Sequence, residues 1–485
     1  MTSPGTPIPF AESPAPSQAS TRLLPWLVAV AFFMESLDTT ILNTAVPAVA
    51  AALHVGPLSM KAVLASYTLA LAVFIPISGW MADRFGTRRV FASAIGLFTL
   101  GSLLCGLCSN IHLLVACRVV QGMGGAMMVP VGRLTLVRSF AKADLLRVMS
   151  FVSVPALVAP MLGPVAGGLI VGYAHWRVIF FLNIPIGLLG LVMVYLHLPD
   201  FREEHVHPLD FVGLVLFGSG IALLSYVLEV FGEHTLSGAE MTGLLVLSGA
   251  LLAAYWVHAR QLQFPLLNLR LFDIRTFRVA TNGSFFTRLG IGGVPFLLPL
   301  LYQTGLGYTP VQSGLLIVPQ AIAAMGMKAI LRKLLAVIGY KGVLITNTLA
   351  IGSLLLVFTT IHLHSSVGQI VAIAFFYGAC TSLQYTTMNT LVYADIEEKD
   401  ASSASSIAST MQQMAISFGV AFAGLSTAFF VPGSAYSDSA LMINGIHKAF
   451  LCLGALTLVS TVVFVGLKRG DGDAVREHKL MHPDG

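Results

Sequence analysis

Charged residues are scarce in this sequence. Only 10% of its 485 residues are Asp, Glu, Lys or Arg, whereas 56% are hydrophobic. Soluble domains carry about 25% charged residues, because a chain folded in water needs a polar surface. The deficit argues against a soluble globular protein and predicts an integral membrane protein. The polar connections are too short for a separate soluble domain, so the functional residues are expected in or beside the apolar segments.

Motifs of several other protein classes are missing. The sequence has no G-x-x-x-x-G-K-[ST] loop, so ATP is not expected to supply energy. Its five cysteines lie in apolar runs without the pattern of a metal site, and we interpret them as structural. No nucleophile, base and orienting group share one face of any segment, which argues against an enzyme. The net charge of +5 is spread over short loops, which argues against nucleic acid as a partner. We expect no cofactor and no metal.

Long apolar runs recur from Leu23 to Leu467. A helix needs about 20 such residues to cross a bilayer. The runs are continuous and do not alternate as the strands of a membrane barrel do, so an all-α polytopic membrane protein is predicted. The fourteen predicted spans cover about 24–50, 60–81, 90–108, 112–138, 146–172, 177–198, 210–231, 239–259, 277–303, 311–331, 341–361, 366–392, 403–430 and 447–467.

The spans divide as six, two and six. We predict an N-terminal six-helix bundle at 23–200, two linker helices at 201–262 and a C-terminal six-helix bundle at 263–467. Two six-helix repeats around a central site are typical of secondary transporters. The polar segments 1–22 and 468–485 are predicted to be tails, the first of them disordered.

Most Lys and Arg residues outside the spans fall on the side of the N-terminus. Because cytoplasmic loops are enriched in these residues, both termini are predicted to be cytoplasmic. The protein is therefore expected to be a multi-pass protein of a cytoplasmic (inner) membrane, in contact with the lipid bilayer.

The loop between the second and third spans reads GWMADRFGTRR, residues 79–89. We interpret Gly79 and Gly86 as sites of a tight turn and of close helix approach. Asp83 is an acid placed where it can meet a helix N-terminus. The cations that hold this loop on the cytoplasmic side include Arg84 and Arg88.

The pattern G-x-x-x-D-R-x-G-x-R-R at this place resembles the signature loop of the major facilitator superfamily. The resemblance implies a gating role, in which Asp83 is clamped against the start of span thirteen near Ser402 and Ser403 and is released on switching. The corresponding loop of the second half, around 326–341, has no matching acid.

Further segments resemble the fourteen-span drug/proton antiporters of the EmrB/QacA type, and within that family the MdtD branch most. The resemblance to the EmrB/QacA type is carried by LDTTILNTAVP (37–47), RVVQGMGGA (118–126), GPVAGG (163–168) and WRVIFFLNIPIG (176–187). The resemblance to the MdtD branch is carried by GGAMMVPVGRLTLVRSF and GMKAILRKLLAVIGYKGV. The resemblance implies a major facilitator fold with two extra central helices and a small-molecule substrate. It also implies a proton gradient as energy source and a monomer that acts alone or with accessory partners.

The fifth span carries small residues at regular spacing. Gly163 and Gly167 lie four residues apart and form a seam for a neighbouring helix, while Pro164 loosens the backbone hydrogen bonds. The family resemblance identifies this segment as the antiporter motif. A packing seam alone explains the same residues.

Two carboxylic acids, Glu35 and Asp38, interrupt the first span, where each is costly to bury. At 1.5 Å per residue, Asp38 and Arg118 of the fourth span both lie about 9 Å below the outer face. The two side chains can therefore neutralise each other, and an acid in such a setting can bind and release protons. Glu35 lies one turn away and extends the relay or contacts a cationic substrate. The alternative is a static buried pair that locks helix packing.

Other polar and aromatic residues in the spans are candidates for a substrate cavity. Arg288 is a charged residue near the middle of a predicted span, 277–303, in the second half of the chain. It is expected to face the cavity or to meet an acid. Gln121 belongs to the RVVQG stretch, which the resemblance links to proton transfer. The cavity candidates are Glu35, Asn43, Gln121, Arg288, Phe286 and Tyr385.

We interpret the chain as a proton-coupled antiporter that exports drugs or other small amphipathic molecules by alternating access. The intramembrane arginines leave open a second interpretation, the export of a small organic anion or a metal chelate such as citrate or iron-citrate. A non-transporting membrane sensor is a third, although the chain has no extramembrane domain with which to signal.

Overall fold

The computed structural model describes residues 18–140, 142–203, 206–230, 237–397, 400–431, 439–468 and 470–471. Each regular element in these residues is helical. The first half contains α1 (Gln18–Ala52), α2 (Met60–Phe85), α3 (Thr87–Leu107), α4 (Ile111–Ser139), α5 (Lys142–Tyr173), α6 (Val178–Phe181) and α7 (Asn183–His197). The linker helices are α8 (Phe211–Val230) and α9 (Gly238–Gln261). The second half contains α10 (Arg275–Gly292), α11 (Val294–Leu300), α12 (Pro310–Val357), α13 (Val367–Leu391), α14 (Ala401–Phe430) and α15 (Ser439–Val465). Short 3-10 or π turns cover Pro57–Ser59, Leu269–Asp273, Leu301–Gly305 and Phe358–Thr360.

Thirteen segments of the described chain are long and apolar enough to cross a membrane. The remaining predicted span, 146–172, lies within α5, of which Val158–Tyr173 is an apolar helical stretch among the described residues. Two of the thirteen, Pro310–Leu331 and Lys333–Thr360, run along α12, in which Gly339 departs from helical geometry with φ 71°. A positive φ is easy for glycine, so Gly339 supplies the kink at which the chain of α12 changes direction. The first candidate span begins at Leu23, as predicted, although the helix α1 that carries it already starts at Gln18.

Side-chain caps fix several helix starts. Asn110 accepts a hydrogen bond from the Leu113 amide at the start of α4. The side chain of Thr309 caps α12 in the same way, and Gln312 caps the Thr309 amide in return. Such caps satisfy amides that have no partner within the helix. They fix the residues at which α4 and α12 begin.

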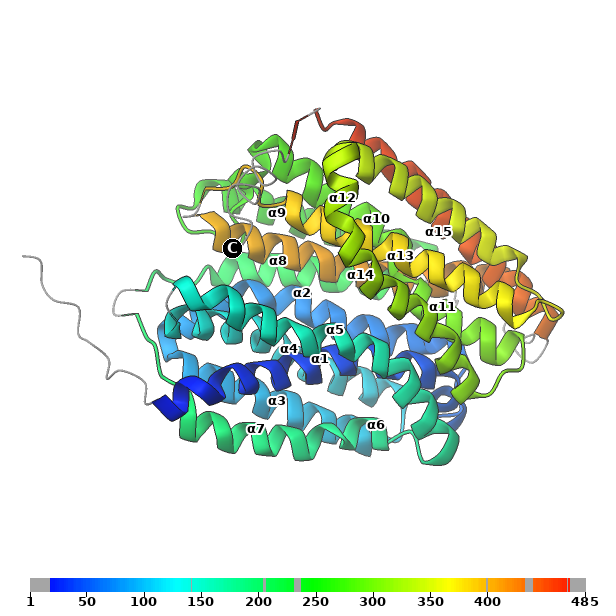
Figure 1. Cartoon of the computed structure of the whole chain (residues 1–485), viewed down its shortest axis with the longest axis horizontal. Coiled ribbons are helices and arrows are strands. Elements are labelled where there is room, and N and C mark those ends of the chain that lie inside the picture. The colour runs from blue at the N-terminus through cyan, green and yellow to red at the C-terminus, as the bar shows by residue number, and fades with distance from the viewer. Residues whose placement is uncertain are drawn as a thin grey trace, which may run out of the picture.

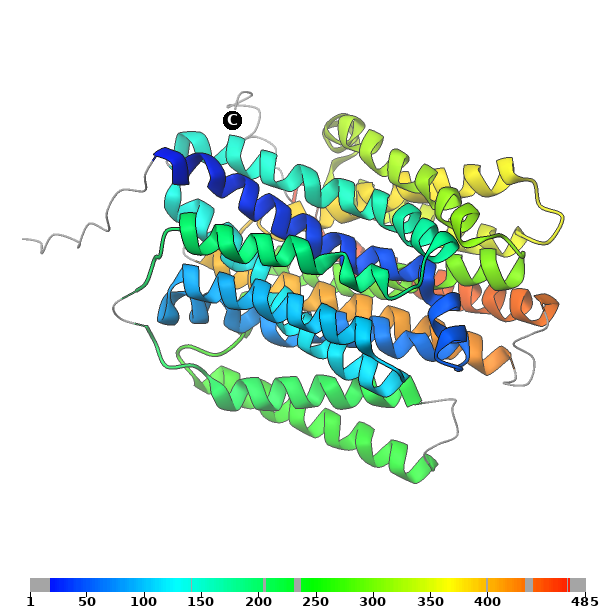
Figure 2. The same ribbon diagram turned by 90° about the horizontal axis from the view of Figure 1, so that it is seen from below.

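The two halves form two bundles that lie side by side (Figure 1). The helix α8 packs against α2 of one bundle and α14 of the other. Outside it lies α9, as the turned view shows (Figure 2). Only 11% of the apolar window of α9 is buried, whereas 56% or more is buried for α2 and α14. The two linker helices are therefore peripheral, and their exposed apolar side chains face the lipid.

We call the end of the bundles with the loops around Gly86, 198–210 and 262–274 the basic end. At the other end the two halves touch directly. A Cβ on Gly168 of α5 would clash with the carbonyl oxygen of Pro310, and Gln303 donates a 2.8 Å hydrogen bond to the Thr44 carbonyl oxygen. Ser417 of α14 donates to the Ala65 carbonyl oxygen of α2 at 3.0 Å. The halves are thus joined at the end opposite the basic end.

Candidate functional site

A buried polar cluster lies in the first half around Asp38 and Arg118, which are each only 1% exposed. The Arg118 Nη1 lies 2.5 Å from the Asp38 carboxylate. The same carboxylate accepts hydrogen bonds from Gln121 Nε2 at 2.8 Å and from Asn183 Nδ2 at 3.1 Å. Ser102 accepts from Gln121 and Asn183 in turn. The expectation that Asp38 and Arg118 meet is confirmed.

The cluster joins four helices. Asp38 belongs to α1, Ser102 to α3, Arg118 and Gln121 to α4, and Asn183 begins α7. Close helix approach makes this possible, since a Cβ on Gly101 of α3 would lie 2.6 Å from the Gln121 Cα. Only glycine fits at such a contact.

Arg118 has an aromatic neighbour as well as a carboxylate. Its guanidinium carbon lies 4.2 Å from the ring centroid of Tyr67 on α2. A cation over a ring face gains electrostatic attraction, and more so away from water. The Arg118 charge is therefore held by an ion pair on one side and by an aromatic ring on another.

Glu35 lies outside this cluster. It is half-buried, and its neighbour Ser36 donates a 3.5 Å hydrogen bond to it. Asn43 is likewise half-buried on α1. Neither residue contacts the Asp38 carboxylate in the described structure, so Asp38 alone carries the ion pair with Arg118.

The signature loop has a different set of contacts from the expected one. Asp83 pairs with Arg138 of α4 at 2.9 Å, and Arg138 also contacts Glu203 at 2.9 Å. The predicted contact of Asp83 with Ser402 and Ser403 is not made in this conformation. The reason is geometric: the halves are joined at the opposite end, and at the basic end Asp83 finds its counter-charge within its own half.

The two glycines of this loop differ. Gly86 has φ 92° and the Asp200 carboxylate lies directly against it, so the predicted tight turn and close approach are confirmed. Gly79 lies inside α2, and a Cβ there would have no neighbour within 4 Å. The prediction of close approach at Gly79 is wrong for this conformation. Arg88 donates through Nε to the Leu198 carbonyl oxygen at 2.6 Å, while Arg84 is exposed.

The small residues of α5 pack tightly. Gly163 faces Thr40 and Gly167 faces the Ile41 carbonyl oxygen, both on α1. The Pro164 carbonyl oxygen lies against Gly314 of α12 in the other half. The predicted packing seam is confirmed, and it lies where α1, α5 and α12 meet.

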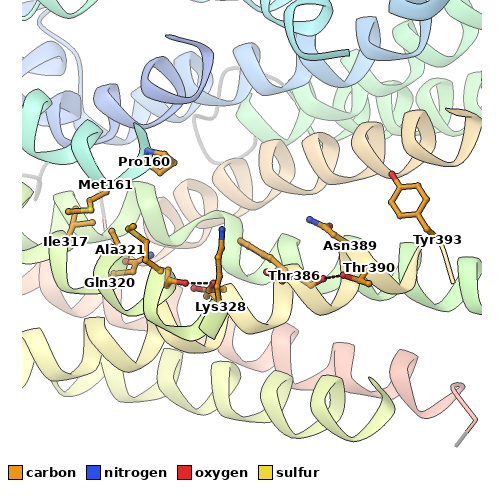
Figure 3. A pocket seen from close by; sticks show the side chains of 15 residues that line it. Pro160, Met161, Ile317, Gln320, Ala321, Lys328, Thr386, Asn389, Thr390 and Tyr393 are labelled. Atoms are coloured by element: carbon orange, nitrogen blue, oxygen red, sulfur yellow. Dashed lines mark hydrogen bonds between the residues drawn. The ribbon is translucent and has the colours of Figure 1, made fainter. Parts of the chain in front are cut away.

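A cavity of about 760 Å³ lies between α5, α12 and α13. Figure 3 shows its lining, with Pro160 and Met161 on the α5 side and Lys328 and Asn389 extending from α12 and α13. The full lining is Pro160, Met161, Ile317, Gln320, Ala321, Ala324, Met325, Lys328, Thr381, Ser382, Tyr385, Thr386, Asn389, Thr390 and Tyr393. Because Tyr393 follows the end of α13, the cavity reaches the basic end.

Of the six predicted cavity residues, Tyr385 lines this cavity and Arg288 lies directly behind it. The guanidinium carbon of Arg288 is 3.9 Å from the Tyr385 ring centroid, and its Nη2 donates to the lining residue Asn389 at 3.1 Å. Gln121 is instead fully buried in the Asp38 cluster, and Phe286 is 42% exposed beside Phe285. The lining of this cavity does not include Glu35, Asn43, Gln121 or Phe286.

Sequence reasoning missed several residues of both sites. Ser102 and Asn183 complete the buried cluster, and Asn183 lies in the WRVIFFLNIPIG segment. Lys328 and Asn389 line the cavity. Lys328 lies in the predicted span 311–331, and a cation in such an apolar run is a signal of a functional role.

The sequence matches the profile of the Major Facilitator Superfamily over residues 28–420 and 280–480. It is 39% identical over 446 residues to the putative multidrug resistance protein MdtD of Serratia proteamaculans (strain 568), a match covering 92% of this chain and 93% of that protein. It is 41% identical over 445 residues to the putative multidrug resistance protein MdtD of Escherichia coli O157:H7, covering 92% and 94% respectively.

Solved structures share the fold. A D-xylose–proton symporter superposes with a TM-score of 0.64 at 13% identity, covering 91% of this chain and 96% of that chain. A bacterial homologue of the human lysosomal transporter Spinster, in an inward-facing and unoccupied conformation, gives 0.66 at 11% identity, covering 95% and 98%. The architecture is thus one found in membrane transporters.

Proposed function

The chain belongs to the major facilitator superfamily, and from this premise we propose that it exports drugs or other small amphipathic molecules across the cytoplasmic membrane in exchange for protons. The name of its MdtD relatives supports the class of substrate. The proposal includes fourteen spans with both termini in the cytoplasm, as the basic loops favour.

The observation that carries the proton coupling is the ion pair of Asp38 and Arg118 in a site that is almost completely buried. Ionised Asp38 neutralises Arg118 and accepts hydrogen bonds from two amides. Protonation of Asp38 removes the negative charge and leaves Arg118 without compensation in a site of low polarity. The two protonation states therefore favour different arrangements of the helices, and a proton gradient can shift their populations.

The placement of the cavity supports export. In this conformation the halves touch at the end opposite the basic end, and the cavity reaches the basic end. If the basic end is cytoplasmic, a substrate enters from the cytoplasm. Arg288 and Tyr385 are then substrate-binding residues, and the Asp83–Arg138 pair is a contact of the inward-open state that changes on switching.

The other predicted roles remain part of the proposal. Glu35 is the second acid of the proton pathway or a contact for a cationic group, and the α5 seam of Gly163, Pro164 and Gly167 is a hinge between the halves. No cofactor is required. The protein is proposed to act as a monomer in the inner membrane, alone or with accessory partners.

The test uses inside-out vesicles that contain the protein and have an acidic interior, with a fluorescent proton probe. Amphipathic cations, neutral drugs, amphipathic anions and citrate are added one at a time. Proton efflux on addition of amphipathic compounds supports the proposal. A response to citrate alone replaces it with export of a small organic anion or metal chelate. Silence across the panel, with inserted protein demonstrated by immunoblot, contradicts proton-coupled transport of these classes.

A further inference from the structure

The cavity between α5, α12 and α13 has a cationic side. Its fifteen lining residues include Lys328 and contain no Asp or Glu. Arg288 adds a second positive charge directly behind the lining residues Tyr385 and Asn389. The field inside the cavity is therefore positive, and a low-polarity wall strengthens it.

The charge of Arg288 has no counter-charge among the described residues. The side chain is 5% exposed, and its hydrogen-bond acceptors are the neutral oxygens of Ser284, at 3.0 Å from Nε, and of Asn389. Arg118 in the first half is equally buried but is paired with Asp38. A buried charge without a partner is costly. An anion bound in the cavity would supply Arg288 with a counter-charge, as Asp38 does for Arg118 in the other half.

The hydrogen bonds of Asn389 also favour an anion. Its Oδ1 accepts from Arg288 Nη2 at 3.1 Å and from Gln412 Nε2 at 2.9 Å. With the oxygen held by two donors, the Nδ2 hydrogens are left for the cavity that Asn389 lines. Figure 3 shows the nitrogen ends of Lys328 and Asn389 on the same side of the ribbons that carry them. The cavity thus offers an ammonium and an amide donor together.

The remaining wall is apolar and adaptable. Pro160 and Met161 come from α5, and Ile317, Ala321 and Met325 from α12. Methionine side chains adjust to ligands of varied shape. The volume of about 760 Å³ lies within the range of small-molecule sites, about 300–1,000 Å³. This wall fits the hydrocarbon body of a small molecule.

We propose that this cavity binds amphipathic organic anions of low charge, with the carboxylate or sulfonate at Lys328 and Asn389 in the field of Arg288. Two cations neutralise at most two negative charges, so a tricarboxylate such as citrate would keep a charge without a partner in a partly apolar cavity. The proposal deepens the proposed function by naming its substrate class, and as transport it depends on that function.

The experiment measures binding to the purified full-length protein in lipid nanodiscs without a gradient. The probes share one apolar body: 2-naphthoate, 2-naphthamide and 2-naphthylmethylammonium, with citrate as the tricarboxylate. Calorimetry is expected to give at least about tenfold tighter binding of the naphthoate than of the amide, the usual gain from one charge-assisted hydrogen bond. Equal affinities, a preference for the ammonium probe, or tighter binding of citrate than of naphthoate overturns the proposal.

Variants locate the site. Lys328→Gln and Arg288→Gln are each expected to reduce the preference for naphthoate over naphthamide about tenfold, whereas Arg270→Gln, which removes an exposed cation outside the cavity, leaves it unchanged. Lys328→Glu is expected to turn the preference towards the ammonium probe, and it tests the site even if Arg288→Gln does not fold. A preference that survives Lys328→Glu overturns the assignment.

This test is separate from that of the proposed function. Anion-selective binding that depends on Lys328, together with no proton efflux from vesicles, supports the site and contradicts the coupling. Proton efflux with cations or neutral drugs, together with no selectivity for naphthoate, supports transport and overturns the anion site.

Discussion

Asp38 of α1 and Arg118 of α4 lie 2.5 Å apart, although 80 residues separate them in the chain. Among the ion pairs of the described residues, this is the one in which both side chains are 2% exposed or less. Because the site excludes water, the attraction between the Asp38 carboxylate and the Arg118 guanidinium is strong, and the loss of either charge is costly. Two experiments follow from this pair, one on transport and one on stability.

The first prediction concerns transport. Asp38→Asn keeps the shape of the side chain, and its amide oxygen can still accept from Gln121 and Asn183, but the group no longer binds a proton. We expect normal insertion and a loss of proton-driven uptake into inside-out vesicles, down to the level of vesicles without the protein. Substrate binding without a gradient should persist.

Asp38→Glu is the matched control, because it keeps an ionisable group and is expected to retain part of the uptake. If Asp38→Asn accumulates substrate against its gradient as the unmodified protein does, Asp38 has no part in the coupling.

The second prediction concerns stability. Arg118→Met leaves the Asp38 carboxylate buried without its cation, which costs about 3–5 kcal/mol when a buried pair is broken. The double variant Asp38→Asn with Arg118→Met removes both charges and should be more stable than Arg118→Met alone. Thermal unfolding in detergent, followed by the fluorescence of a dye that does not react with thiols, measures the four midpoints of the unmodified protein, Asp38→Asn, Arg118→Met and the double variant. Simple addition of the single effects would mean that the two groups are not energetically coupled.

The pairing of Asp38 with Arg118 could be predicted from the sequence because helical rise converts residue number into depth, and two opposite charges at one depth lower each other's burial cost. Ser102 and Asn183 were missed because a neutral polar residue costs less to bury and leaves a weaker signal. Their place in the cluster is set by packing around Gly101, which sequence spacing alone does not reveal.

The contact of Asp83 in this conformation could not be predicted from the sequence for a different reason. A transporter of this kind has more than one conformation, and the sequence is the same in each. The family resemblance implies a contact across the two halves in one conformation, whereas in this conformation Asp83 pairs with Arg138 of its own half. The role of Lys328 could not be predicted either, because only the position of α5 opposite α12 reveals that it lines a cavity.

The third prediction concerns the approach of α3 and α4. Gly101→Ala would place a Cβ 2.6 Å from the Gln121 Cα, so the helices must separate and Gln121 must leave the Asp38 carboxylate. We expect a lower unfolding midpoint and reduced proton-driven uptake. Gly96→Ala on the same helix is the control, since its nearest neighbour would be an ordinary contact at 3.8 Å. That substitution should leave the midpoint unchanged or raise it by the usual helix preference for alanine, about 0.5–1 kcal/mol. Equal effects of the two substitutions would contradict the tight α3–α4 contact.

The fourth prediction concerns pH and the link between the C-terminal end of α15 and α10. Burial alone would raise the pKa of Asp471, but the hydrogen bonds from Arg275 and from the Lys468 amide outweigh it and hold the pKa below its usual range. A carboxylate with a depressed pKa in the folded state stabilises the fold above its unfolded pKa, about 3.9, and this contribution is lost as the pH falls through the folded pKa.

Asp471→Asn should therefore lower the unfolding midpoint at neutral pH, and the difference from the unmodified protein should shrink as the pH falls below about 4. Thermal unfolding of both proteins over this pH range measures it, with the exposed acid Asp273 replaced by Asn as a control that shifts the midpoint little. The bidentate contact, with Nη1 at 2.7 Å and Nη2 at 2.6 Å, ties the chain after α15 to the first turn of α10. A difference that stays constant down to low pH would mean that Asp471 stabilises the fold through its shape and not through its charge.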